Sequence, residues 1–198
     1  MTAVVDVPAD VEAFLDELVS VLREATELEA AYLIGSAALG AYEPGRSDLD
    51  VYAVVAEPLS GEAKRTLRAL KSPARQLELV VYTREQAAAE NPRYELNTGD
   101  PEASDFWFVL DRSSAEQHAV ALHGPPWSEI FVPVPRERVL QAIAESLEWQ
   151  ERNDPSGAGS VLNTMRLLHW LETGQWASKP AVAAWLREHV RETLERKR

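Results

Sequence analysis

The stretch LIGSAALGAYEPGRSDLDVYAVV, residues 33–55, constrains the fold more than any other part of this chain. An apolar run ends at Gly35 and Ser36, a short alanine-rich segment follows, and two aspartates introduce a second apolar run rich in valine. This order is typical of a strand, a turn, the first residues of a helix and a second strand. The stretch therefore predicts a mixed α/β unit with polar groups at the edge of its sheet.

The aspartates of this stretch, Asp48 and Asp50, stand one residue apart at the start of the predicted strand 49–55. Alternate side chains of a strand share a face, so the two carboxylates are expected about 5 to 7 Å apart. Carboxylates that close repel one another unless a cation lies between them. The chain has no cysteine, and its 4 histidines show no metal-binding spacing. We therefore expect an oxygen-bound Mg²⁺.

Two further features accompany the aspartates. Gly35 and Ser36 lead from a predicted strand into a short helix, where backbone N–H groups and a hydroxyl can bind a phosphate. Glu78 lies between leucines in a third predicted strand, residues 76–82, and would join the aspartates if that strand lay beside 49–55. Each feature alone is common as a turn, a strand terminus or an exposed edge. Their occurrence in one order favours a functional cluster.

The whole chain predicts an α+β fold in two parts, a small mixed sheet with helices over residues 1–134 and a helical bundle over residues 135–198. The segment HGPPWSEIFVPVP, residues 123–135, is rich in proline and has no regular apolar period, which indicates the boundary. Residues 91–105 are expected to form a loop. Apolar spacing predicts the remaining elements, which are helices at 9–28, 61–72, 106–120, 136–151, 160–172 and 179–194 and strands at 30–34, 49–55 and 76–82.

Charge and hydropathy exclude several classes of partner. The net charge is −12, with 23 acidic and 10 basic residues in 1–134 against 9 and 10 in 135–198. Such a charge argues against binding to nucleic acid or an anionic membrane, because both need a dense cationic surface. No apolar run is long enough to span a membrane, and the first residues do not resemble a signal peptide. We expect a cytoplasmic monomer that acts on a small or cationic partner.

The motif IGS…SDLDVYAVV resembles that of the nucleotidyltransferase superfamily of DNA polymerase β type, in which Gly-Ser, a short spacer and Asp-x-Asp precede a third acid on a neighbouring strand. The resemblance extends through LELVVY, AVALHGPPWSEIFVPVP and LNTMRLLHWLETGQWASKPAVAAWL to the streptomycin/spectinomycin adenylyltransferases. These enzymes confer antibiotic resistance by transferring AMP from ATP to aminoglycosides. The resemblance covers residues 30–190 and implies a nucleotidyltransferase domain followed by an all-α domain.

The resemblance also implies roles for individual residues. Asp48 and Asp50 would bind two Mg²⁺ ions, and Glu78 would be the catalytic base. The triphosphate of ATP would be held by four residues from both parts of the chain, namely Gly35, Ser36, Arg166 and Lys179. The acceptor would be a small, hydroxylated and cationic molecule. The glycine-rich DPSGAGS at 154–160 replaces polar residues of the family and argues against streptomycin.

Residues that could contact this acceptor are Glu78 and four others, Asp100, Asp105, Trp107 and Asp154. Exposed acids and tryptophans are more often a solvated surface and packing residues. Two other functions stay open. The chain could transfer AMP to a partner protein, which its large helical part disfavours, or it could be a catalytically silent nucleotide sensor, which the intact acids disfavour.

Overall fold

The computed structural model describes residues 6–89, 93–100 and 104–196, and the chain divides into two compact units, Met1–Pro135 and Arg136–Arg198. The first unit holds all five strands that the structure describes, and the second consists of helices. The predicted α+β fold is confirmed.

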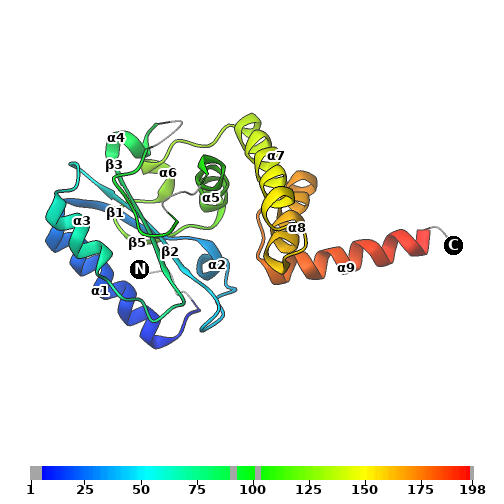
Figure 1. Ribbon diagram of the computed structural model, residues 1–198, viewed down its shortest axis with the longest axis horizontal. Helices are drawn as coiled ribbons and strands as arrows, with labels where there is room; N and C mark the ends of the chain where they lie inside the picture. Colours follow the sequence, from blue (N-terminus) through cyan, green and yellow to red (C-terminus); the bar gives the residue numbers. More distant parts are fainter. Residues whose placement is uncertain (1–5, 90–92, 101–103, 197–198) are drawn as a thin grey trace. The chain divides into compact units, whose positions relative to one another are not determined.

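The sheet of the first unit has the strand order β4-β3-β2-β1-β5 (Figure 1). Its central strands β1 (Leu28–Leu33), β2 (Leu49–Val55) and β3 (Leu77–Thr83) are rich in aliphatic and β-branched residues, as buried strands require. β2 and β3 run parallel, whereas β1 pairs antiparallel with β2 and with β5 (Val120–His123). The predicted third strand therefore does lie beside 49–55.

Helices cover both faces of this sheet (Figure 1). On one face, α1 (Ala9–Ala25) and α3 (Gly61–Arg68) pack against alternate strand residues such as Val51, Leu79 and Val81. On the other face, α5 (Asp105–His118) and α6 (Trp127–Ile130) pack against the intervening residues Tyr32, Tyr52 and Tyr82. Two short helices, α2 (Gly35–Ala38) and α4 (Arg84–Ala87), follow β1 and β3 directly.

One sequence-based expectation for this unit is wrong, and the structure adds to another. The expected loop 91–105 contains the edge strand β4 (Leu96–Asn97), whose Leu96 is buried, and its last residue, Asp105, begins α5. The proline-rich segment 123–135 is more than a boundary, because it includes α6 and buries Trp127, Ile130 and Phe131 against the tyrosines of the sheet. Both elements are too short to produce a recognisable apolar period.

The second unit contains α7 (Arg136–Asn153), α8 (Ala158–Thr173) and α9 (Lys179–Arg196). Gly174 caps the C-terminus of α8, with a left-handed φ of 71° and an N–H that donates to the Trp170 carbonyl at 2.8 Å. Trp170 and Trp176 of this second unit are buried, and their indole rings stack on one another. Among the described residues of either unit, no helix has the length and hydropathy needed to cross a bilayer.

Candidate active site

Two acids of the first unit stand side by side on neighbouring strands. In the parallel pairing of β2 with β3, Asp50 is the direct partner of Glu78. Residues in register share a face of the sheet, about 4.8 Å apart at the backbone. Both side chains are half-buried, and the next residues along this face, Tyr52 and Val80, are buried. The sheet therefore brings together the two carboxylates that the sequence placed on separate strands.

Asp48 lies one residue before β2. The guanidinium of Arg75 donates from Nε to Asp48 Oδ1 at 2.9 Å and from Nη2 to Oδ2 at 2.5 Å. The charge of Asp48 also reaches Glu78, whose pKa is raised first by burial and then by this charge. Asp48, Asp50 and Glu78 thus form one acidic cluster at the ends of β2 and β3, with Arg75 attached to it.

Gly35 brings the backbone of α2 against this cluster. Its φ is +65°, and a Cβ at this position would lie 1.8 Å from Asp50 Oδ2. The Ile34 N–H before it donates to the Asp50 carbonyl at 2.9 Å. The first N–H groups of a helix have no partner within it, and no side chain caps α2. The turn at Gly35 and Ser36 therefore offers donors beside the carboxylate of Asp50.

The chain after β4 closes over Glu78. The hydroxyl of Thr98 accepts from the Leu79 N–H and donates to the Leu77 carbonyl, both at 2.9 Å. A Cβ on the following Gly99 would lie 3.4 Å from Cγ and Cδ of Glu78. The next residue, Asp100, is close enough for its charge to raise the pKa of Glu78. The structure thus places Asp100 with the cluster.

Glu78 has the electrostatic properties of a proton acceptor. Burial raises the pKa of its carboxyl above the ordinary value, and the charges of Asp48 and Asp100 raise it further, while Arg75 opposes them. A carboxylate with a raised pKa is a stronger base than an exposed one, and such shifts are common at catalytic positions.

The cluster fits a divalent cation in its donor chemistry. Carboxylate oxygens are the ligands that Mg²⁺ prefers, and it usually takes only one or two from the protein, with water and phosphate oxygens completing its shell. In the described part of the chain, no group of three or more acidic, histidine or cysteine side chains is arranged to hold a metal ion, so the protein would supply at most two such ligands. The guanidinium on Asp48 shows that a positive charge is already accommodated there.

The other predicted contacts of the first unit lie on α5. Asp105 is its exposed first residue. Trp107 is half-buried, and its ring packs at 4.8 Å from that of Phe106. α5 packs against α2, the helix that begins at Gly35.

In the second unit, Arg166 is held against the segment that leads into α9. Its Nε donates to the Ala177 carbonyl at 2.9 Å, and its guanidinium lies 5.7 Å from the ring centre of Trp176. Lys179, two residues after Ala177, begins α9. The fold of this unit therefore brings the predicted phosphate-binding pair to one region.

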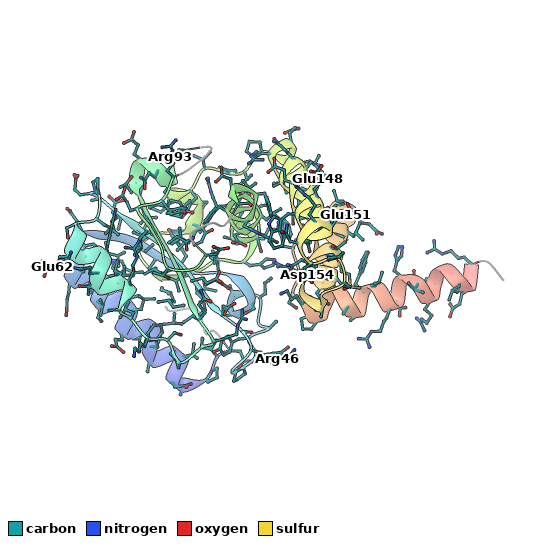
Figure 2. All side chains as sticks on the ribbon, viewed as in Figure 1. Arg46, Glu62, Arg93, Glu148, Glu151 and Asp154 are labelled. Carbon is teal, nitrogen blue, oxygen red and sulfur yellow. The ribbon has the colours of Figure 1, made fainter. Side chains whose placement is uncertain are left out.

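Asp154 is occupied with local structure. It follows α7, and its Oδ2 accepts from the Ser160 hydroxyl at 3.2 Å. A Cβ on Gly157 would lie 1.8 Å from the same oxygen, so the glycine makes room for this carboxylate. Asp154, Gln150 and Ser160 line a pocket of about 410 Å³ among α7, α8 and α9. Figure 2 shows Asp154 beyond Glu148 and Glu151 along α7.

Arg75 is the residue of the cluster that the sequence analysis missed. Its position follows from the parallel register of β2 and β3, which sets residue 75 beside residue 47. The signal available in the sequence was a basic residue shortly before the acid of the third strand.

Known proteins resemble this chain in sequence and fold. Residues 129–196 match the family model of the aminoglycoside adenylyltransferase C-terminal domain. Aminoglycoside (3'') (9) adenylyltransferases of Shigella flexneri and Escherichia coli are each 30% identical to it, over 92% of this chain and 80% of theirs. The spectinomycin adenyltransferase AAD(9) from Enterococcus faecialis, solved with ATP and spectinomycin, matches 90% of this chain and 83% of its own with a TM-score of 0.73 and 20% identity.

Proposed function

The chain belongs to the aminoglycoside adenylyltransferase family, and from that premise we propose that it transfers AMP from ATP to a hydroxyl of an aminocyclitol or aminoglycoside antibiotic in an Mg²⁺-dependent reaction. The observation that carries this proposal is the in-register pair of Asp50 and Glu78, with Asp48 beside it. Nucleotidyl transfer depends mainly on positioning and on stabilising charge, and this cluster can do both.

Asp48 and Asp50 are the residues that would hold the metal. When bound, Mg²⁺ supplies charge stabilisation at the phosphate oxygens and lowers the pKa of a coordinated hydroxyl. Glu78 accepts the proton of the acceptor hydroxyl as the hydroxyl oxygen attacks the α-phosphorus, and the bond between the α- and β-phosphates breaks to release pyrophosphate. Its raised pKa suits this task, because a base works best with a pKa near the working pH.

Two groups of residues bind the triphosphate in this proposal. The turn at Gly35 and Ser36 offers backbone donors and a hydroxyl next to Asp50. Arg166 and Lys179, close in the second unit, supply positive charge. The family resemblance supports both assignments.

The acceptor proposed here carries positive charge and hydroxyl groups. Asp100 lies next to Glu78, so an ammonium group near the reacting hydroxyl would find a carboxylate. Asp105, Trp107 and Asp154 are further candidate contacts. The relatives, which are aminoglycoside and spectinomycin adenylyltransferases, support an acceptor of this class.

The proposal is tested with ATP labelled in its α-phosphate, Mg²⁺ and one of three acceptors, which are spectinomycin, streptomycin and a cell lysate. A reaction without acceptor is the control. We expect label on spectinomycin and release of pyrophosphate. Label on a protein of the lysate alone would show that the chain modifies a partner protein. No transfer to any acceptor would contradict the proposed activity.

A further inference from the structure

Arg75 and Asp48 form a bidentate ion pair. Both oxygens of the carboxylate accept from the guanidinium, at 2.9 and 2.5 Å. This parallel arrangement is the strongest that an arginine makes with a carboxylate. The side chain of Asp48 is 18% exposed and that of Arg75 61%, so the carboxylate is fixed and the guanidinium faces solvent.

The backbone of the sheet fixes this contact. The Arg75 N–H donates to the Ser47 carbonyl at 3.3 Å, and the Leu49 N–H donates to the Gln76 carbonyl at 2.9 Å. These bonds continue the ladder of β2 and β3 beyond the strand ends. Residue 75 therefore stays beside Asp48 whichever rotamer its side chain adopts.

The guanidinium of Arg75 lies in the field of the whole acidic cluster. Its pKa is raised chiefly by the hydrogen bonds and charge of Asp48, and further by the charges of Glu78 and Asp50. One positive charge thus offsets part of the repulsion among three carboxylates. A divalent cation bound to these carboxylates would need the same oxygens and would bring a like charge close to Arg75.

We propose that Arg75 is the resident counter-cation of the cluster, which occupies both oxygens of Asp48 in the absence of metal and yields them when a divalent cation binds. Arg75 thereby lowers the affinity of the free enzyme for metal. This inference rests on the proposed function, because it takes Asp48 as a metal ligand. It adds Arg75 as a residue that sets the affinity of the cluster for metal.

The effect should be moderate. An ion pair with an exposed arginine contributes little, because water screens it. We expect Arg75→Gln to bind Mn²⁺ about three- to ten-fold more tightly than the wild-type protein. Arg75→Lys keeps the positive charge but cannot make the bidentate hydrogen bonds. Its Mn²⁺ affinity should therefore lie between those of Arg75→Gln and the wild-type protein.

The experiment is calorimetric titration of the full chain with Mn²⁺ alone, without nucleotide or acceptor. The matched control is Arg46→Gln, which removes an equal charge from the loop before Asp48 (Figure 2). Arg46 pairs with Glu43 at 2.9 Å instead. We expect Arg46→Gln to leave the Mn²⁺ affinity unchanged. An Arg75→Gln affinity equal to or weaker than wild type, or an equal gain in both variants, would overturn the inference.

A third variant separates this inference from the proposed function. If Asp48→Asn abolishes Mn²⁺ binding while Arg75→Gln leaves it unchanged, the metal site stands and the role of Arg75 is wrong. If Asp48→Asn binds Mn²⁺ as tightly as wild type, the proposed metal site is wrong, and the role of Arg75 is wrong with it.

Discussion

At the scale of single residues, Glu78 gives the sharpest prediction about chemistry. Glu78→Gln keeps the size of the side chain but removes the proton acceptor, so kcat should fall by about 10²- to 10⁴-fold. Affinity for a non-hydrolysable ATP analogue should stay within about two-fold, because the triphosphate contacts remain. Steady-state kinetics and calorimetry measure the two effects. A kcat close to wild type would exclude Glu78 as the base.

The same substitution predicts a gain in stability. The pKa of Glu78 is raised in the folded protein, so folding favours the protonated form. The stability that this group contributes is fully present below its unfolded pKa and is lost as the pH rises through the folded pKa. Glu78→Gln, which imitates the protonated form, should therefore raise the Tm at pH 8 and leave it unchanged near pH 3. The exposed Glu57→Gln is the control for the loss of one carboxylate, and its Tm should stay close to that of the wild-type protein.

Gly35 allows the close contact of its backbone with Asp50 to be tested separately from its left-handed backbone conformation. Gly35 and Gly40 have nearly equal φ values, +65° and +64°, but a Cβ at Gly40 meets no atom within 4 Å. Alanine at either position should cost roughly 1–2 kcal/mol for the left-handed backbone. Only Gly35→Ala should also displace the Asp50 carboxylate and weaken Mn²⁺ binding more than ten-fold. Chemical denaturation and calorimetry of both variants check this, and equal Mn²⁺ affinities would contradict it.

At the scale of elements, the sequence predicted those parts whose pattern is long enough to read. The strand at 49–55 was predicted with its observed bounds, because aliphatic residues fill both of its buried faces. The edge strand β4, only two residues long, could not be found this way. The pairing of Asp50 with Glu78 was expected only on the condition that the strands were neighbours. The contact of Arg75 depends on their register, which no local pattern reveals.

The residues after β4 give a prediction about how the chain next to Glu78 is kept in position. The Thr98 hydroxyl ties the chain after β4 to β3 through two hydrogen bonds. Thr98→Val keeps the shape but leaves the Leu79 N–H without this acceptor, which should cost about 1–3 kcal/mol. It should also loosen the chain that places Asp100 near Glu78, and so raise KM for the acceptor more than KM for ATP. Thr98→Ser retains the hydroxyl and should behave nearly as wild type in denaturation and kinetics. Equal KM changes for both substrates would contradict the proposed place of Asp100.

At the scale of the whole molecule, the proline-rich segment decides where the first unit ends. Its chain is tied to α5, because Arg112 donates to the Val132 carbonyl at 3.0 Å and the Val134 N–H donates to Glu116 at 2.5 Å. Upstream, Trp127 and Phe131 stack at 3.9 Å and cover the rings of Tyr32 and Tyr52. The segment therefore completes the hydrophobic core on this face of the sheet and is more than a linker between the two units.

This arrangement predicts which fragment of the chain folds by itself. Residues 1–135 should give a cooperatively unfolding protein, whereas residues 1–123 should not, because β5 would be present but one face of the sheet would lack its aromatic cover. In the full chain, Trp127→Ala should lower the stability of the first unit by about 3–5 kcal/mol. Circular dichroism and urea denaturation distinguish these outcomes, and a folded 1–123 fragment would show that the sheet does not need the segment.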